Sequence, residues 1–332
     1  MALFKTKEEF QKIVRVNRAT FSLENVLPDI LLVERDQIKK LLGATLYAKL
    51  HAGYQDDTLD DKQKELLYLV QYALGNLAMV SYMDINQVLI SDGGITRSDK
   101  AAYRFQIRSL KLNLLTKGYN GLESVLEFLE EHEKAENFTD WGINSAVVVT
   151  RQFFINSARE YSQEYDISDS RMTYLSLQSI IKKVEPFAVE SVIGEALYEE
   201  IKAQIKEGNV SDENKLLLSK FIRPAVAHLV AAKAIAERSF KFSGDTISLN
   251  LEMLVDDTSE GAMANNDQLL LKKIEQAYTD GQTFLSKLRQ YLNKNASADN
   301  YKAYFESELY TPDHVVPATF RNKPDTKVFA FI

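Results

Sequence analysis

The sequence predicts a mainly α-helical protein with small β-hairpins, in which one helical domain occurs twice. The first observation is an internal repeat: residues 42–47, LGATLY, return as residues 193–198, IGEALY, at an offset of 151. The offset holds without a gap from Val26 to Leu67, and 11 of those 42 pairs are identical. The second observation is that apolar residues recur at helical spacing, and the third is a turn sequence between short apolar arms in each half. A tandem duplication is the simplest explanation.

The repeat divides the 332 residues into two domains, residues 1–150 and residues 151–332. With 45% hydrophobic and 26% charged residues, each half is able to bury a core of its own. The closest approach to a membrane span is residues 225–236, which His228 and Lys233 interrupt, so no membrane segment is expected. The N-terminus lacks the pattern of a secretory signal, and the chain has no cysteine, which indicates a cytoplasmic protein without disulfides.

The charge balance argues against tight binding of nucleic acid. The net charge is −7, and no short window is rich in lysine and arginine. Because proteins grip DNA by neutralising phosphates with clustered cations, this surface is suited to DNA that passes without adhering.

Each half is expected to open with a short apolar strand, residues 2–4 and residues 152–155, followed by a polar helix. The start of each helix carries the S/T-x-x-E pattern of a capping box, in which side chains satisfy the free backbone N–H groups of the first turn. The residues concerned are Thr6 with Glu9, and Ser157 with Glu160.

The next segment is amphipathic and leads into the repeated glycine and tyrosine. Tyr47 and Tyr198 are interpreted as packing residues whose hydroxyls bond to backbone, rather than as functional phenols. The acidic loop after the first of them, residues 55–61, lacks the spacing of a calcium loop. Asp60 and its counterpart Ser211 are therefore expected to cap the following helices.

The central helix of each domain follows, with apolar residues at helical spacing. These residues are Leu66, Val70, Ala73, Leu74 and Leu77 in the first helix, and Leu217, Phe221, Ala225 and Leu229 in the second. Pro224 lies inside the second helix and is expected to kink or split it, because proline lacks an N–H and clashes with the preceding turn.

A hairpin is predicted after each central helix, around Asp92 and Gly93 in the first half and around Gly244 in the second. A long helix follows, expected to break near Gly118 or Gly281, and from there the halves match at an offset of 163. The second copy thus holds 12 more residues, assigned to a mobile surface loop at residues 256–267.

Each half is expected to end in an aromatic connector, residues 137–141 and residues 300–305, and then in a β-prone run. The runs are residues 146–155 and residues 326–332, and the second is predicted to be a strand that folds back or pairs with a neighbouring chain. The candidate interface residues are accordingly Val328, Phe329, Phe331, Ile332, Asp92, Gly93 and Gly244.

The sequence offers no set of residues that would carry catalysis. The four histidines, which are widely separated in sequence, are His51, His132, His228 and His314. No zinc-binding spacing, nucleophile elbow, phosphate loop or dinucleotide fingerprint is present, and adjacent carboxylates are typical of solvated helix faces. We therefore expect no catalytic residues, no cofactor and no metal, and a protein that is not an enzyme.

The order of elements resembles that of the head-to-tail connector, or adaptor, proteins of tailed bacteriophages. The similarity is greatest to duplicated forms from phages and prophages of Bacteroidetes, of the type of the crAss-like phage ring proteins. The residues that carry it are Gly43 with Tyr47, Gly194 with Tyr198, the hairpins at Asp92, Gly93 and Gly244, and the helices with Gly118 or Gly281. The usual adaptor has one such domain, so the duplication is a departure from the pattern.

The resemblance implies a homo-oligomeric ring, a dodecamer, between the portal and the tail proteins of a virion assembled in the host cytoplasm. DNA would pass through the lumen without specific binding. One alternative is a monomeric bacterial module with two similar protein-binding surfaces. Another is an enzyme whose site lies between the copies, for which converging buried carboxylates would be the evidence.

Overall fold

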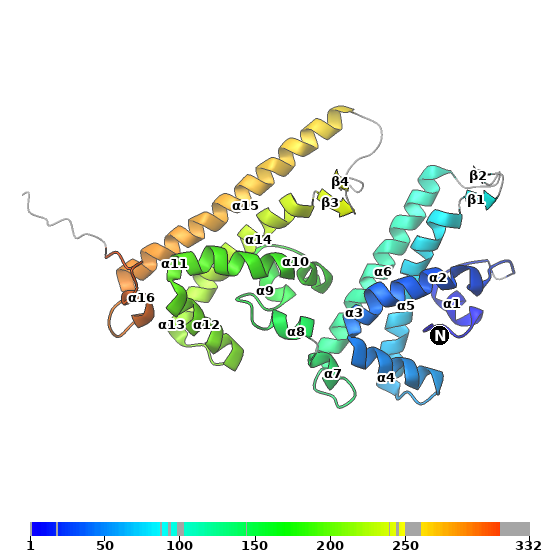
Figure 1. The fold of residues 1–332 in the computed structure, drawn as a ribbon, viewed down its shortest axis with the longest axis horizontal. Coiled ribbons are helices and arrows are strands. Elements are labelled where there is room, and N and C mark those ends of the chain that lie inside the picture. The colour runs from blue at the N-terminus through cyan, green and yellow to red at the C-terminus, as the bar shows by residue number, and fades with distance from the viewer. Residues whose placement is uncertain are drawn as a thin grey trace, which may run out of the picture. The chain divides into compact units, whose positions relative to one another are not determined.

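A computed structural model shows a mostly helical chain that divides into two compact units (Figure 1). The first unit is Met1–Thr150 with Ser170–Leu175, and the second is Arg151–Asp169 with Ser176–Ile332. The structure describes residues 2–17, 19–86, 88–91, 94–97, 103–143, 145–238, 240–243, 246–249 and 260–312.

The first unit is arranged around the helix pair α5 and α6, with α2 and α1 packed on α5. In chain order its elements are α1 (Lys7–Ile13), α2 (Leu23–Val33), the π-helix η1 (Glu34–Ile38), α3 (Lys39–Leu42), α4 (Ala44–Gln55), α5 (Asp61–Asn86), β1 (Val88–Ser91), β2 (Gly94–Arg97), α6 (Arg104–His132), α7 (Thr139–Gly142) and α8 (Ser145–Thr150).

The second unit is likewise arranged around a helix pair, α14 and α15, with α9 packed on α14. In chain order its elements are α9 (Ala158–Glu164), α10 (Arg171–Val184), the π-helix η2 (Glu185–Glu190), α11 (Ser191–Ile193), α12 (Glu195–Glu207), α13 (Asp212–Leu217), the π-helix η3 (Leu218–Ile222), α14 (Arg223–Arg238), β3 (Phe240–Ser243), β4 (Thr246–Leu249), α15 (Glu260–Asn295) and α16 (Lys302–Phe305). The helix α10 belongs to the second unit only from Ser176 onward.

Two short antiparallel strand pairs follow the central helices. β1 pairs with β2, with Val88 opposite Arg97 and Ser91 opposite Gly94. β3 pairs with β4 in the same register, from Phe240 opposite Leu249. The residues between the strands, Asp92, Gly93 and Gly244, lie outside the described residues.

The predicted strands at the start of each half are wrong. Residues 2–4 and residues 152–155 are irregular, although their apolar side chains are buried. The run from residue 146 is also helical, as α8, down to Thr150. A strand needs a partner for its backbone groups, and here side chains of the unit satisfy those groups instead.

The predicted N-caps are confirmed, and one of the two predicted S/T-x-x-E capping boxes is complete. Both of its bonds join Thr6 and Glu9. Ser157 accepts a bond from the backbone N–H of Glu160, but the carboxylate of Glu160 accepts from the N–H of Asn156 at 3.1 Å, so the second box is only half formed. Asp60 and Gln63 exchange side-chain bonds with each other's backbone N–H at 2.8 and 3.1 Å, and Ser211 accepts from Asn214. These short polar patterns therefore fix where four helices begin.

The split predicted at Pro224 is confirmed, since the π-helix η3 and α14 meet at Arg223, directly before the proline. A π-helical turn widens the hydrogen-bonding pattern at the point where proline offers no N–H. The first unit has no proline there, and its α5 is a continuous helix of 26 residues.

The two long helices do not break at their glycines, contrary to the sequence-based prediction. Gly118 lies inside α6 and Gly281 inside α15, and both helices are continuous. A Cβ on Gly118 would lie 2.5 Å from Leu77, and one on Gly281 would lie 2.6 Å from Leu229. The glycines therefore allow each long helix to approach its central helix closely.

The segment expected to be a surface loop, residues 256–267, is in part helical. Residues 260–267 form the first turns of α15, and residues 256–259 lie outside the described residues. The polar composition that suggested a loop is thus also compatible with a helix.

One helical stretch of the described chain, Asp61–Met83, is long and apolar enough to cross a membrane by length and composition alone. By these criteria it resembles a membrane span more closely than residues 225–236, the segment that the sequence analysis named. A share of 56% of it is buried inside the structure, and a core helix satisfies the same criteria. Leu66, Val70 and Leu74 are fully buried in the first unit, which is the environment of a central core helix.

The aromatic connectors bury equivalent residues at the offset of 163. Trp141 is 3% exposed and donates its indole N–H to the carbonyl of Leu41 at 3.2 Å. Tyr304 is fully buried, and its hydroxyl donates to Asn293 Oδ1 at 2.8 Å. Each connector thus fastens the end of its unit to an earlier helix.

The glycine of α6 that faces the backbone of α5 gives a stability prediction. A Cβ on Gly121 would lie 2.9 Å from the Cα of Ala73, which is backbone and cannot rotate away. Glycine to alanine in an open helix position stabilises by about 1 kcal/mol. Gly121→Ala should instead destabilise the first unit by about 1–3 kcal/mol in urea unfolding, because the helices must separate.

The control is Asn120→Ala on the exposed face of the same turn, which should be neutral or stabilising. A Gly121→Ala protein as stable as the parent would show that the two helices do not need this approach.

Candidate functional site

Each unit contains one buried glutamate at the first position of a π-helix. Glu34 begins η1 and Glu185 begins η2, and they are one of the identical pairs of the repeat. Their exposed fractions are 3% and 1%. Carboxylates are rarely so buried without partners, so their surroundings are the first place to look for function.

In the first unit, the glutamate holds the irregular segment that precedes α1. The N–H of Leu3 donates to Glu34 Oε2 at 3.4 Å, and the amide of Gln71 on α5 donates to the carbonyl of Leu3 at 2.7 Å. The hydroxyl of Tyr47 donates to Glu34 Oε1 at 2.5 Å. We call this set of bonds the first clamp.

The second clamp holds Phe154, the counterpart of Leu3, in the same way. Its N–H donates to Glu185 Oε1 at 2.7 Å, and Arg223 Nε donates to its carbonyl at 2.9 Å. Lys202 forms an ion pair with Glu185 Oε2, and its ammonium lies 4.0 Å from the centre of the Phe154 ring. An ammonium therefore stands where the first clamp uses a phenol.

The clamps explain the repeated glycine and tyrosine only in part as predicted. Gly43 and Gly194 have φ values of 79° and 81°, a backbone region that favours glycine, so each chain turns there into the next helix. The ring of Tyr198 packs against Phe154 at 5.3 Å. The hydroxyl of Tyr47, however, bonds to a carboxylate and not to backbone, which corrects the sequence-based expectation.

The electrostatics of the clamps indicate structural carboxylates. Burial raises the pKa of Glu34, while the hydrogen bonds from Tyr47 and Leu3 oppose this shift. Burial also raises the pKa of Glu185, and the ammonium of Lys202 opposes it. Both oxygens of each carboxylate accept bonds from the protein itself, so the geometry supports anchoring of a segment rather than proton transfer to a substrate.

The histidines lie apart in the structure as well. His51 stacks on Tyr47 at 5.9 Å, and the Nδ1 of His132 bonds to the carbonyl of Phe128. His228 packs between Tyr165 and Phe284, and burial lowers its pKa. His314 lies outside the described residues, and within the described part of the chain no group of three or more histidine, aspartate or glutamate side chains is placed to hold a metal ion.

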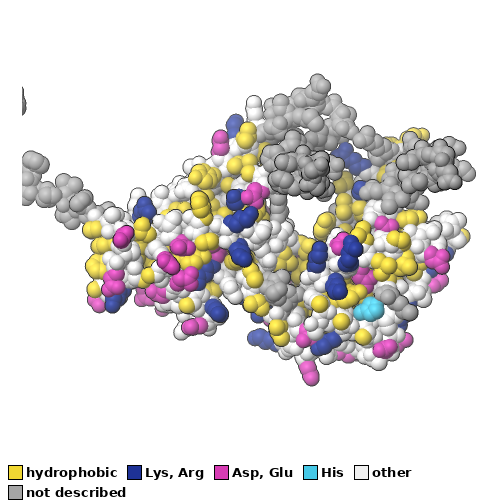
Figure 2. Space-filling model, viewed as in Figure 1, with side chains coloured by type: hydrophobic (Ala, Val, Ile, Leu, Met, Phe, Trp, Pro, Cys, Tyr) yellow, Lys and Arg dark blue, Asp and Glu magenta, His cyan; other side chains and the backbone are white. Residues whose placement is uncertain are grey.

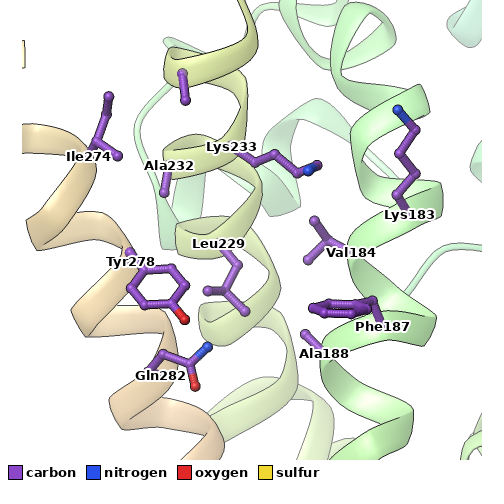
Figure 3. Close-up of a pocket in the computed structure, with 11 residues that line it drawn as sticks. Lys183, Val184, Phe187, Ala188, Leu229, Ala232, Lys233, Ile274, Tyr278 and Gln282 are labelled. Carbon is purple, nitrogen blue, oxygen red and sulfur yellow. The ribbon is translucent and has the colours of Figure 1, made fainter. Parts of the chain in front are cut away.

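An open apolar groove of about 510 Å³ lies on the second unit, along α14 between α15 and the α10–η2 segment (Figure 3). Its lining residues are Lys183, Val184, Phe187, Ala188, Leu229, Ala232, Lys233, Ala236, Ile274, Tyr278 and Gln282. Phe187 is 86% exposed and Tyr278 is 55% exposed, and their rings flank Leu229 from opposite sides. Exposed aromatic rings around a hollow are typical of an interaction surface.

The first unit presents a different apolar surface. Phe105, Leu112 and Tyr119 follow one another at intervals of seven residues along α6, which places them on one helix face. They are 70%, 46% and 46% exposed. We call these residues the α6 stripe. Figure 2 shows hydrophobic side chains among charged ones on the exposed surface of both units.

The candidate interface residues drawn from the sequence lie outside the described residues, and the structure therefore does not place them. They are Val328, Phe329, Phe331, Ile332, Asp92, Gly93 and Gly244. The groove and the α6 stripe were missed by sequence reasoning. The heptad spacing of Phe105, Leu112 and Tyr119 was a readable signal for the stripe, whereas the groove depends on three helices meeting.

Comparison with known proteins gives one match. The profile of a family of unknown function matches residues 38–151 and again residues 189–314. The matches begin 151 residues apart and end 163 residues apart, which are the two offsets of the internal repeat. No curated protein and no solved structure matches the chain.

The ion pair of the second clamp gives a prediction about its partners. Lys202→Met leaves Glu185 buried without its counter-charge, and removal of one partner of a buried pair typically costs about 3–5 kcal/mol. Urea unfolding should show this loss in the second unit, with much of it recovered in the double variant Lys202→Met/Glu185→Gln. Lys206→Met, at an exposed site on the same helix, should be nearly neutral. Equal stabilities for Lys202→Met and Lys206→Met would contradict the clamp.

The first clamp should make stability depend on pH. Because the folded-state pKa of Glu34 is raised above 4.5, its protonated form favours folding. That contribution is complete below the unfolded-state pKa and is lost as the pH rises through the folded-state pKa.

Glu34→Gln lacks this titration, so its stability relative to the parent should increase between about pH 4 and pH 7, as followed by unfolding at several pH values. Glu65→Gln, at an exposed position, is the matched control and should show no such trend. A constant difference for Glu34→Gln would mean that burial does not perturb this carboxyl.

Proposed function

The chain belongs to DUF6712, a family of unknown function, and we propose that it is a structural virion protein forming a ring between the portal and the tail of a tailed bacteriophage. The ring would be a homo-oligomer, a dodecamer in the form that the resemblance to connector proteins implies. The portal and the tail proteins are its proposed partners, in a virion assembled in the cytoplasm of the bacterial host.

The observation that carries the proposal is that the two units expose apolar surfaces at non-equivalent places. Counted along α6 and α15 at the offset of 163, the α6 stripe corresponds to polar residues in the second unit. Phe105, Leu112 and Tyr119 correspond to Gln268, Glu275 and Gln282.

The chemistry of the groove likewise differs at an equivalent position of the first unit. Phe187, its most exposed lining residue, corresponds at the offset of 151 to the exposed Asp36 of the first unit. Closed rings form when two different surfaces of each copy meet in head-to-tail contacts. A chain with one apolar surface on each unit, and with different chemistry on each, has the property that such contacts require.

The charge of the chain is compatible with a DNA passage. The net charge of −7 would disfavour adhesion of phosphates to the lumen, so that DNA could move through it. Specific recognition of DNA forms no part of the proposal.

The alternative function is a monomeric protein-binding module, and the groove of the second unit is the observation that favours it. A module with two similar binding surfaces would show equivalent hollows in both units. A hollow of about 380 Å³ among the described residues of the first unit is lined by Ala2, Phe4 and Leu23, which are not the counterparts of the residues that line the groove. An enzyme finds less support, because the buried carboxylates of the described chain, Asp29, Glu34 and Glu185, each bond within their own unit.

The test is the mass of the purified protein at several concentrations, by light scattering and negative-stain imaging, with and without a portal protein. We expect rings, or rings that depend on the portal protein. Leu112→Glu should weaken association at least roughly tenfold, because it places a charge in an apolar contact. Deletion of residues 326–332 should also impair rings while leaving the helix content measured by circular dichroism nearly unchanged.

Glu275→Lys changes the charge at the equivalent position of the second unit and is the matched control, with no expected effect on association. A protein that stays monomeric at every concentration and ignores the portal protein would favour the binding module over the ring.

A further inference from the structure

Two aromatic side chains at the groove of the second unit are largely exposed to solvent. Phe187 and Tyr278 stand at its two walls with exposed fractions of 86% and 55%. Leu229, Ala232 and Ile274 line it between them (Figure 3). Contiguous apolar surface of this kind is usually covered by a partner or by another part of the same chain.

The described chain ends beside the C-terminal part of α15, the helix that forms one wall of this groove. Asn293 near the end of α15 donates to Thr311 Oγ1 at 3.0 Å and accepts from the N–H of Thr311 at 3.2 Å. Gln282 and Ile274 of the groove lie 11 and 19 residues before Asn293 on the same helix. At 1.5 Å per residue, these distances along the helix are about 17 Å and about 29 Å.

The sequence after this anchor is long enough to return to the groove. Thirteen residues, 313–325, lie between positions 312 and 326, which makes fourteen steps along the chain. A chain of that length extends to at most roughly 46–50 Å, and a random coil of that length averages roughly 20 Å between its ends. The average end-to-end distance of this coil is comparable to the distance along α15 from Asn293 to the groove. The effective concentration of residues 326–332 at the groove is therefore roughly millimolar.

The chemistry of residues 326–332, TKVFAFI, fits the same hollow. Five apolar residues stand in a row, Val328 to Ile332. In an extended peptide alternate side chains share a face, so that Phe329 and Phe331 point together. Two neighbouring rings on one face match a groove whose walls carry one aromatic ring each.

We propose that residues 326–332 bind the groove of the second unit of the same chain in the unassembled protein. The contact covers Phe187 and Tyr278 and keeps the apolar segment out of solvent, so that a free copy does not associate through either. If the ring proposed above forms, on which this step alone rests, neighbouring copies can exchange the segment, and the same contact then joins two subunits.

The absence of cysteine allows a direct test by cross-linking. Lys233→Cys is introduced at the groove together with Lys327→Cys in the segment, because in an extended peptide Lys327 shares a face with Phe329 and Phe331. The full chain is oxidised at low micromolar concentration. We expect an intrachain disulfide, identified by mass spectrometry, in at least tenfold higher yield than in the control pair Lys206→Cys/Lys327→Cys. Lys206 is exposed on α12, and α12 contacts α16, which lies shortly before the end of the described chain. A tethered segment with no preference for the groove would therefore reach Lys206 as readily as the groove.

Phe187→Ser/Tyr278→Ser in the cross-linking background should reduce the yield at least fivefold. Both side chains are largely exposed, so the fold should survive, and circular dichroism checks this. Equal yields for the groove and control pairs, or no effect of the serine variants, would overturn the proposal. Cross-links found only between chains would assign the groove to a second copy instead. The cross-links are read on the monomer fraction, isolated by size-exclusion chromatography before oxidation, so that the result does not depend on whether rings form.

Discussion

The bond between a buried carboxylate and one backbone N–H organises each unit. Glu34 and Glu185 accept from Leu3 and Phe154, which have no strand or helix of their own. A buried backbone group without a partner costs about 1–3 kcal/mol, and the carboxylate removes that cost while its own charge is met by nearby donors. The π-helical turn that begins at each glutamate widens the helix at the point where the side chain must reach inward.

The helix pair and the clamp together explain why the repeat tolerates so much change elsewhere. The central helix of each unit, α5 or α14, supplies the donor to the clamped carbonyl. The glycines of the long helix that follows, α6 or α15, pack against the same central helix. The donor to the buried carboxylate is Tyr47 in the first unit and Lys202, the counterpart of His51, in the second, so the equivalent glutamates accept from different positions of the repeat. What the two copies share is therefore a set of internal bonds, and the outer faces are free to differ.

Part of this fold is predictable from sequence because its determinants are local. The capping residues Thr6, Ser157 and Asp60 act within four residues, and Pro224 acts on its own turn. The wrong predictions concern residues whose partners lie far away in sequence. Residues 2–4 and 146–150 have the composition of strands, but in the described structure they have no strand to pair with. Gly118 suggested a helix break because its packing partner, Leu77, lies 41 positions earlier and the sequence does not show that the two residues meet. The groove could not be predicted for the same reason, since α10, α14 and α15 meet only in the folded unit.

In the proposed ring, duplication would give the subunit a freedom that a single domain lacks. A head-to-tail contact needs two complementary surfaces, and in a single domain both must be compatible with one core and one set of loops. In this chain the first unit carries the α6 stripe where the second has Gln268, Glu275 and Gln282, and the second carries Phe187 where the first has Asp36. Each surface has thus changed without a matching change in the other copy, while the buried glutamate and the segment that it holds have been kept in both. Divergence of exposed apolar surfaces around a shared anchor is what selection on contacts with other molecules would produce.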